Sequence, residues 1–379
     1  MPRMAYPPLI PEMSVALSLT HTEAGMLMSG FWAGYLAMQF PAGFLSDKIG
    51  AKRVYTVFLV FVGFLCLLTG FAKSFADCLV YRFVNGFAAG SVYAPGSALV
   101  LRWFPPKDRG VAIGFFMTGA SIGTVIALAF SAAVSSIFGS WRWSFWFFGI
   151  PALFVAMLSL FFLREKPDPG FEYDKVGRGG GKVSYGVVFK DLRFWVLCFA
   201  SLGGSAVYVG SLTWIPTYLT MSVNLTEVYA GSISSLIALT GVVATPLGGF
   251  VADRILKKRS PIIFVGTFTS GVAAILFSIV MPTSLYSSVA LFAIMLFFAT
   301  LWFITSSLLP EWFQLEVMGT ASGFLNLMSM IGAVLGPFIF GFILDLTSSF
   351  SLGWFALGCI ATFLSLPMLW VMRKELGKR

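Results

Sequence analysis

The amino-acid sequence predicts an all-α polytopic membrane protein built from two homologous six-helix bundles. Three observations lead to this fold class: an apolar composition, a series of long apolar segments, and an internal repeat of polar motifs. Hydrophobic residues make up 58% of the 379 residues and charged residues only 11%. A soluble domain of this length could not present that balance to water, so the chain is predicted to lie in a membrane.

The repeat is clearest in two polar segments. Residues 43–53 read Gly-Phe-Leu-Ser-Asp-Lys-Ile-Gly-Ala-Lys-Arg, and residues 249–259 read Gly-Phe-Val-Ala-Asp-Arg-Ile-Leu-Lys-Lys-Arg, which begin 249 − 43 = 206 positions later. Trp103 recurs as Trp312, 312 − 103 = 209 positions later. Because long apolar segments separate these marks, the repeat unit is a bundle of membrane helices. Parallel repeats of this kind build transporters around a site near the bilayer midplane.

The apolar segments are long enough to cross a bilayer, which takes about 20 helical residues. Eleven complete spans are predicted, near residues 24–45, 54–72, 77–101, 111–135, 144–163, 193–219, 228–251, 261–281, 286–309, 318–344 and 353–372. They divide the chain into an N-terminal bundle at 1–163, a cytoplasmic linker at 164–192 and a C-terminal bundle at 193–379. The linker is polar and contains a glycine-rich run, which is typical of a flexible connection.

The first span is expected to be incomplete. At an offset of 206, Met1 corresponds to Val207, which lies inside the predicted span at 193–219. Residues 1–13 contain four prolines and are too short to cross a bilayer. We therefore expect part of the first helix to be absent, and a version extended upstream to transport better than the 379-residue form.

The basic residues predict the orientation. Almost all of the 25 Lys and Arg residues fall in loops on one side of the predicted spans, whereas Lys73 and Arg142 fall on the other side. Basic loops are retained in the cytoplasm, so we expect a multi-pass protein of the cytoplasmic membrane with a cytoplasmic C-terminus. The net charge of +9 is spread over short loops, and therefore reflects topology rather than nucleic-acid binding.

No pattern in the sequence predicts a metal, a cofactor or an enzyme. The four cysteines lie in or near apolar helices without paired spacing and are interpreted as small core residues. The single histidine, His21, is expected in an extracytoplasmic loop, where a metal site would lack partners. A phosphate-binding loop motif and a catalytic cluster are both missing. We expect a monomer in the lipid bilayer whose partner is a small-molecule substrate.

Two motifs resemble those of the major facilitator superfamily. The segment 43–53 is similar to the signature loop of that family, and the copy at 249–259 differs by having Leu256 at the second glycine. In the fourth span, Arg82 followed by Gly86 is similar to a second family motif, and segment 102–110 follows it as in organic-anion transporters of the family. The resemblance implies a secondary transporter, a symporter or antiporter, that moves an organic anion by alternating access.

The resemblance also implies a cytoplasmic gate. Asp47 and Asp253 would pair with nearby bases in one state and release them as the two halves rock. The residues assigned to this gate are Gly43, Asp47, Lys48, Gly50, Arg53, Arg102, Arg109, Asp253 and Arg254.

Arg82 is the main candidate for substrate binding. A cation inside the bilayer costs several kcal/mol unless it faces water, a partner or a ligand. Arg3 is expected at a similar depth, and two cations favour a carboxylate, which pairs with guanidinium in a bidentate way. In the alternative interpretation, Arg82 snorkels near Asp77 and is structural. Further candidates, chosen by position, are Gln39, Tyr35, Asn85, Tyr93, Tyr208, Asn326 and Trp302.

The coupling ion is not predicted. Organic-anion members of the family often carry a Glu seven residues after the fourth-span arginine, but position 89 is alanine here. Two alternatives for the function remain open. One is a transporter of a neutral solute such as a sugar, and the other is a membrane sensor that has the same fold but does not transport.

Overall fold

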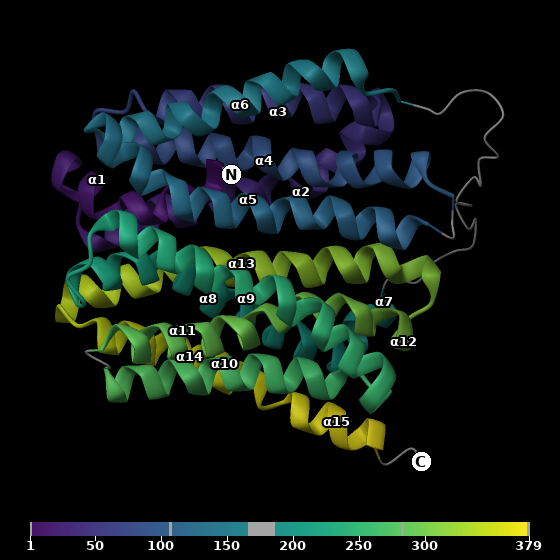
Figure 1. The fold of residues 1–379 in the computed structure, drawn as a ribbon. Helices are drawn as coiled ribbons and strands as arrows, with labels where there is room; N and C mark the ends of the chain where they lie inside the picture. Colours follow the sequence, from purple (N-terminus) through teal and green to yellow (C-terminus); the bar gives the residue numbers. More distant parts are fainter. Residues whose placement is uncertain (1, 106–107, 166–185, 282–283, 377–379) are drawn as a thin grey trace. The chain divides into compact units, whose positions relative to one another are not determined.

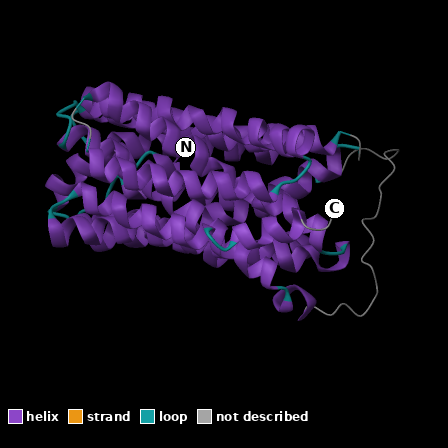
Figure 2. Cartoon of the chain, turned by 90° about the horizontal axis from the view of Figure 1, so that it is seen from below, coloured by secondary structure: helices purple, strands orange, loops and turns teal. Residues whose placement is uncertain are grey.

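The computed structural model describes residues 2–105, 108–165, 186–281 and 284–376, and these residues form helices joined by short connections (Figure 1). Within these residues, Figure 2 shows helices and loops and no strand. The predicted all-α class is therefore confirmed for the part of the chain that the structure describes.

The chain divides into two compact units. Unit 1 comprises Met1–Ser18 and Gly30–Gly179, and unit 2 comprises Leu19–Ser29 and Gly180–Arg379. One helix, α2 (His21–Ile49), thus begins in unit 2 and continues in unit 1. Most of the predicted linker, residues 166–185, lies outside the described residues.

Unit 1 contains the first half of the elements. After the 3₁₀ turns η1 (Pro2–Met4) and η2 (Pro7–Leu9), the helices are α1 (Ile10–Leu17), α2, α3 (Ala51–Thr69), α4 (Phe75–Trp103), α5 (Arg109–Phe138) and α6 (Trp141–Phe162). Side-chain caps begin several of them. Ser74 and Asp77 form a capping box at the start of α4, and the Ser140 hydroxyl accepts from the Arg142 N–H at the start of α6. The middle helix α3 lies against α4 and α6.

Unit 2 contains the remaining elements. They are α7 (Gly186–Lys190), α8 (Leu192–Met221), α9 (Glu227–Phe250), the π-helical turn η3 (Val251–Leu256), α10 (Ser260–Val280), α11 (Leu285–Ala299), the 3₁₀ segment η4 (Thr300–Leu308), α12 (Leu309–Trp312), α13 (Leu315–Thr347), α14 (Phe350–Ser365) and α15 (Met368–Leu376). Asp191 caps α8. Burial raises the pKa of the Asp191 carboxyl, but hydrogen bonds from Arg193 outweigh this effect and hold the pKa below its usual value.

Nine helices among the described residues are long and apolar enough to cross a membrane. They correspond to nine of the eleven predicted spans. The other two, 24–45 and 77–101, correspond to α2 and α4, which contain 29 residues each but are more polar. The predicted span 286–309 is not one uniform helix, because the 3₁₀ segment η4 separates α11 from α12. The count of eleven spans stays a prediction.

Glycines bring helix backbones together within each unit. A Cβ atom on Gly86 of α4 would lie 1.8 Å from the Phe31 carbonyl oxygen of α2. In unit 2, a Cβ atom on Gly332 of α13 would lie 2.1 Å from the Leu202 carbonyl oxygen of α8. Such close approach is typical of helices packed in lipid. In unit 1 it places Arg82, one turn before Gly86, beside the chain around Phe31.

Candidate functional site

Arg82 is buried inside unit 1, where its side chain is 3% exposed. The Arg82 Nη2 donates to the Arg3 carbonyl oxygen at 3.3 Å. Its Cζ atom lies 4.6 Å from the ring centre of Tyr6 and 5.4 Å from that of Phe31. Contacts of this kind between a cation and a ring face are worth about 0.5–2 kcal/mol each. The guanidinium is therefore held among aromatic rings rather than extended along the protein surface.

Arg3 lies in the same group of side chains. Its Cζ atom is 5.5 Å from the ring centre of Trp32, which in turn is 5.8 Å from the ring centre of Phe31. We call Arg3, Tyr6, Phe31, Trp32 and Arg82 the arginine–aromatic cluster. It brings together the two cations that the sequence singled out. The three aromatic residues were not predicted, because nothing distinguishes them in a chain that is 17% aromatic.

Tyr35, Gln39 and Tyr93 extend from this cluster. The Tyr35 ring centre lies 5.5 Å from that of Trp32, and the side chains of Tyr35 and Gln39 are hydrogen-bonded. Arg3 and Tyr93 are both close enough to Tyr35 to interact with it electrostatically. Tyr93 is 40% exposed and its ring stacks on Phe116 at 6.3 Å. Tyr35 therefore supplies a hydroxyl group within electrostatic reach of Arg3, and Gln39 and Tyr93 are linked to the cluster through Tyr35.

Asn85 is directed elsewhere. Its Nδ2 donates to the Val62 carbonyl oxygen of α3 at 3.1 Å, and its Oδ1 is buried without a hydrogen-bond partner among the described residues. Asn85 and Arg82 lie three positions apart on α4, which predicted a common face. In the structure, Arg82 contacts α2 and the N-terminal segment, whereas Asn85 contacts α3.

Two of the three candidates in unit 2 share a neighbour. Trp302 of η4 stacks on Phe303 with ring centres 4.2 Å apart, and the Tyr208 ring centre of α8 lies 5.7 Å from that of Phe303. The indole Nε1 of Trp302 is buried and, among the residues described, has no hydrogen-bond partner. Asn326 lies on α13, three residues before Ser329.

A group of buried hydroxyls in unit 2 comes from Ser201, Ser205, Thr305 and Ser329. The Ser201 hydroxyl of α8 contacts those of Ser329 and Thr305, and the Ser205 hydroxyl donates to the Ser329 carbonyl oxygen at 2.6 Å. Small polar residues commonly hold membrane helices together in this way. These hydroxyls join α8, η4 and α13, and the packing of the three elements explains them.

At the predicted gate of unit 1, the structure shows a carboxylate that the sequence analysis missed. Glu165 accepts the backbone N–H groups of Ala51 at 2.9 Å and Lys52 at 2.7 Å, and its Oε1 accepts a hydrogen bond from Arg102 Nη1. It therefore caps α3 and ties α3 to the end of α4. Gly50, the residue before α3, has φ = +98°, a conformation that favours glycine.

The other gate residues of unit 1 make fewer contacts. The Lys48 Nζ lies 6.0 Å from the ring centre of Phe44, Arg53 is exposed, and a Cβ atom on Gly43 would meet nothing within 4 Å. The side chains of Asp47 and Arg109 lie outside the described residues, so their predicted pairing is not tested.

At the predicted gate of unit 2, the contacts centre on Arg259. The Arg259 Nε donates to Asp253 Oδ1 at 3.0 Å and lies 3.7 Å from Glu311 Oε1. Its Nη1 donates to the Ser307 carbonyl oxygen at 2.5 Å. Arg254, which the sequence analysis assigned to the gate, is exposed. Arg259 is the last residue of the second copy of the repeated motif and corresponds to Arg53 in the first copy. This correspondence could have pointed to Arg259 in the sequence.

Each half has a carboxylate near its end, Glu165 after α6 and Glu375 within α15. Glu375 lies 375 − 165 = 210 positions after Glu165. The Ser260 hydroxyl at the start of α10 donates to Glu375 Oε2, and the Trp312 indole donates to Glu375 Oε1 at 3.3 Å. Each unit thus uses a carboxylate at its end to hold the start of an earlier helix. Across the described chain, no three His, Cys, Asp or Glu side chains form a group that could bind a metal.

Relatives with named functions match this sequence over most of its length. The chain is 27% identical to a hexuronate transporter of Bacillus subtilis over 96% of this chain and 88% of the relative. It is 28% identical to a probable sulfoacetate transporter of Cupriavidus necator, over 93% and 85%. It is 26% identical to a probable galactarate/D-glucarate transporter of Escherichia coli K12, over 90% and 82%.

The fold is similar to that of solved transporters. A bacterial homologue of the human lysosomal transporter Spinster, crystallised in an inward-facing and occupied conformation, superposes with a TM-score of 0.85 at 17% identity. The match covers 100% of this chain and 94% of that structure. At this identity the likeness concerns the fold.

A family model covers the entire chain. The model described as Major Facilitator Superfamily matches residues 1–305 and residues 222–379. Together with the apolar helices and the transporter relatives, this match shows a multi-pass protein of the cell membrane. Because the relatives are named as transporters, the protein is not an enzyme. The chain belongs to the Major Facilitator Superfamily.

Proposed function

We propose that this protein is a secondary transporter of a small organic anion and that its substrate class is the sugar acids. Hexuronate, galactarate and glucarate, which name two of the relatives, carry carboxylate and hydroxyl groups. Sulfoacetate, which names a third, is also an anion. The common chemistry of these substrates is a negative charge on a small polar molecule.

The observation that carries the proposal is the burial of Arg82 beside Arg3 within the arginine–aromatic cluster. In surroundings poor in water, a guanidinium attracts a carboxylate strongly and orients it by paired hydrogen bonds. Tyr35 lies within electrostatic reach of Arg3 and is hydrogen-bonded to Gln39; we assign Tyr35, Gln39 and Tyr93 to the hydroxyl groups of a sugar acid. We assign supporting roles to Asn85 in unit 1 and to Tyr208, Trp302 and Asn326 in unit 2.

We further propose that transport occurs by alternating access and that the cytoplasmic ends of both units contain the gate. In unit 1 the gate includes Asp47 and the bond between Arg102 and Glu165, and in unit 2 it includes Asp253. Opening would break these charged contacts, which lie near water and are therefore individually weak. In this proposal the protein is a monomer and its C-terminus is cytoplasmic.

Ligand-dependent thermal unfolding tests the anion site directly. A ligand that binds only the folded protein stabilises it by about 2.7 kcal/mol at 100 times its Kd. We expect a hexuronate or an aldarate to raise the melting temperature of the purified protein, and a neutral hexose to leave it unchanged. Stabilisation by the hexose instead of the acids would contradict the proposal.

Two arginine variants locate the site. Arg82→Gln should abolish stabilisation by the acid. Arg142→Gln is the matched control, because the Arg142 side chain also donates to a carbonyl oxygen, that of Ala72 at 3.1 Å, and lies 4.5 Å from a ring centre, that of Trp141. The control should respond to the acid as the parent does. Counterflow of labelled acid in proteoliposomes then separates a transporter from a sensor.

A further inference from the structure

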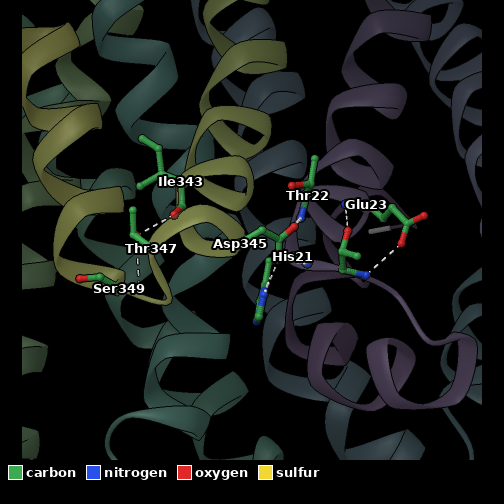
Figure 3. Close-up of polar contacts among 8 residues, drawn as sticks. His21, Thr22, Glu23, Ile343, Asp345, Thr347 and Ser349 are labelled. Atoms are coloured by element: carbon green, nitrogen blue, oxygen red, sulfur yellow. Dashed lines mark hydrogen bonds and ion pairs between the residues drawn. The ribbon is translucent and has the colours of Figure 1, made fainter.

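Within unit 2, the start of α2 is bound to the end of α13 by a single carboxylate (Figure 3). Asp345 Oδ1 accepts the backbone N–H of His21 at 2.9 Å, and Asp345 Oδ2 accepts that of Thr22 at 2.6 Å. The His21 Nδ1 also lies 2.8 Å from Asp345 Oδ1. An ionised carboxylate can only accept, so the hydrogen of that contact resides on the imidazole.

Asp345 acts as a helix cap that comes from another helix. The first N–H groups of an α-helix have no partner within the helix, and a negative charge at this end is favourable. Thr20 and Glu23 provide a second, local cap: the Glu23 Oε2 accepts the Thr20 N–H at 2.9 Å, and the Thr20 hydroxyl accepts the Glu23 N–H at 3.1 Å. The helix can therefore begin without Asp345, so the contact with α13 is additional to helix formation.

Below Asp345 the two helices touch along their backbones. A Cβ atom on Gly341 would lie 2.3 Å from the His21 carbonyl oxygen, and one on Gly25 would lie 2.4 Å from the Pro337 carbonyl oxygen. One turn further on, the Ser29 hydroxyl donates to the Val334 carbonyl oxygen at 2.6 Å. We call this line of contacts the α2–α13 seam; its residues are His21, Gly25 and Ser29 of α2 and Val334, Pro337, Gly341 and Asp345 of α13.

The seam ends where α2 changes unit. Residues up to Ser29 belong with unit 2, and those from Gly30 belong with unit 1, although the helix is continuous. If unit 1 moves against unit 2, then either the seam opens or α2 bends at this point. Among the described ion pairs, His21 with Asp345 is the one that joins α2 to α13. Asp345 is therefore the charged group whose bonds to α2 can set how firmly the seam stays closed.

The residues that correspond to His21 and Asp345 in the other half of the repeat are different. At the offset of 209, Asp345 corresponds to Ser136, and at the offset of 206, His21 corresponds to Glu227. Neither residue of the pair is thus present in the other half. The other half of the fold therefore forms without this pair. This difference points to a role of His21 and Asp345 in function rather than in folding.

We propose that Asp345 is the outer latch of the transporter: it holds α2 on α13, and the extracytoplasmic side opens only when its bonds to His21 and Thr22 are released. The proposal rests on the alternating access proposed above. Its residues differ from those that we assign to substrate binding, so the two proposals can be tested independently.

Thiol labelling from outside the cell tests the latch. Ser29 is 6% exposed and lies in the seam, so Ser29→Cys provides a reporter that reacts with a membrane-impermeant maleimide only when the seam opens. Rates are corrected for the same proteins without the reporter. We expect Asp345→Asn, combined with the reporter, to react about tenfold faster than the reporter alone, which corresponds to about 1.4 kcal/mol.

Glu23→Gln is the matched control. It makes the same change from acid to amide in the first turn of α2, but its bond to Thr20 is local. We expect its labelling rate to stay within about twofold of the reporter alone. A rate for Asp345→Asn equal to that of the reporter alone, or an equal rise in Glu23→Gln, would overturn the latch.

A second variant keeps the test decisive if Asp345→Asn does not give monodisperse protein. His21→Ala removes the imidazole donor and leaves the backbone N–H groups, so a rise of about threefold is expected; an unchanged rate would overturn the proposal. Labelling needs no substrate. A failed latch with intact stabilisation by sugar acids would remove the latch alone, and loss of that stabilisation with normal labelling changes would remove the anion site alone.

Discussion

At the scale of single residues, the environment of Arg82 explains how a cation is accommodated inside the helical unit. Its guanidinium is planar and weakly hydrated, and it meets two ring faces and a carbonyl oxygen. An ammonium group is compact and strongly hydrated, and cannot pair with a carboxylate through two parallel bonds. The geometry of the charge therefore matters as much as its sign.

Arg82→Lys isolates this effect. The charge is retained, but the stacking and the bidentate pairing are lost, so we expect the Kd for a sugar acid to rise at least about tenfold. Isothermal titration with the purified protein measures it, with Arg142→Lys as the control. Equal affinity in Arg82→Lys and the parent would mean that only the charge of Arg82 is used.

Gly86 is expected to tolerate no side chain. A Cβ atom there would lie 1.8 Å from the Phe31 carbonyl oxygen, so Gly86→Ala must separate α4 from α2 at a cost of about 1–3 kcal/mol. Gly119→Ala is the control, because a Cβ atom at Gly119 meets nothing within 4 Å; alanine there should stabilise α5 by about 0.5–1 kcal/mol. Thermal unfolding in detergent measures both, and a neutral Gly86→Ala would disprove the contact.

Sequence reasoning singled out Arg82 and Arg3 as candidates because a charge inside an apolar segment is conspicuous. It could not identify Tyr6, Phe31 and Trp32, since aromatic residues are frequent throughout the chain and their contacts with the arginines depend on how α2 and α4 pack. It also grouped Asn85 with Arg82 from helical spacing. Spacing gives the angle between two side chains, but not which neighbouring helix lies in each direction.

At the scale of elements, helix starts near the predicted cytoplasmic gate depend on carboxylates distant in sequence. Glu165 holds the start of α3 across more than one hundred positions, as the bonds to Ala51 and Lys52 show. The sequence analysis placed Glu165 in a polar linker and gave it no role. A cap that comes from so far along the chain cannot be predicted from the residues next to the helix start.

Glu165→Gln tests the cap of α3. The amide keeps one acceptor oxygen but loses the charge that pairs with Arg102 and favours the helix start, so we expect a loss of about 1–2 kcal/mol in unfolding free energy. Lys48→Gln, a change at the same end of unit 1 at an exposed residue, should cost less than about 0.5 kcal/mol. Chemical unfolding followed by tryptophan fluorescence compares them. Equal losses would attribute the effect to general charge at this surface.

Helix positions were predictable because the thickness of the bilayer sets their length, and nine predicted spans correspond to helices long and apolar enough to cross it. The winding inside a span was not predictable. The 3₁₀ segment at Thr300–Leu308 lies within an apolar span, and the π-helical turn at Val251–Leu256 lies at a polar span end. In neither case does the residue composition differ from that expected for an α-helix at the same place. Hydropathy records burial and does not distinguish one hydrogen-bond register from another.

At the scale of the whole molecule, the repeat predicts halves at 1–163 and 193–379, and this division stays a prediction. The two compact units of the structure have other bounds. The sequence could not predict that α2 divides between them after Ser29, because this assignment depends on contacts with α13, which is more than 300 positions away. The orientation in the membrane is still a prediction from the basic loops.

Labelling of exposed loops tests that orientation. Lys73 and Arg254 are both exposed, and they lie on opposite sides in the predicted topology. A membrane-impermeant maleimide should label Lys73→Cys in intact cells and Arg254→Cys only in inside-out vesicles. The parent is the control, since three of its cysteines are buried and Cys359 is partly buried. The reverse pattern would invert the topology and place the C-terminus outside.

The nine residues of the 3₁₀ segment η4 have a consequence for motion. A 3₁₀ helix rises about 2.0 Å per residue with three residues per turn, whereas an α-helix rises about 1.5 Å with 3.6. Rewinding Thr300–Leu308 as α-helix would therefore shorten the span by about 4.5 Å and rotate one end against the other by about half a turn. Trp302 lies within this segment. Rewinding η4 as α-helix would therefore turn the indole ring of Trp302 from one set of neighbours to another.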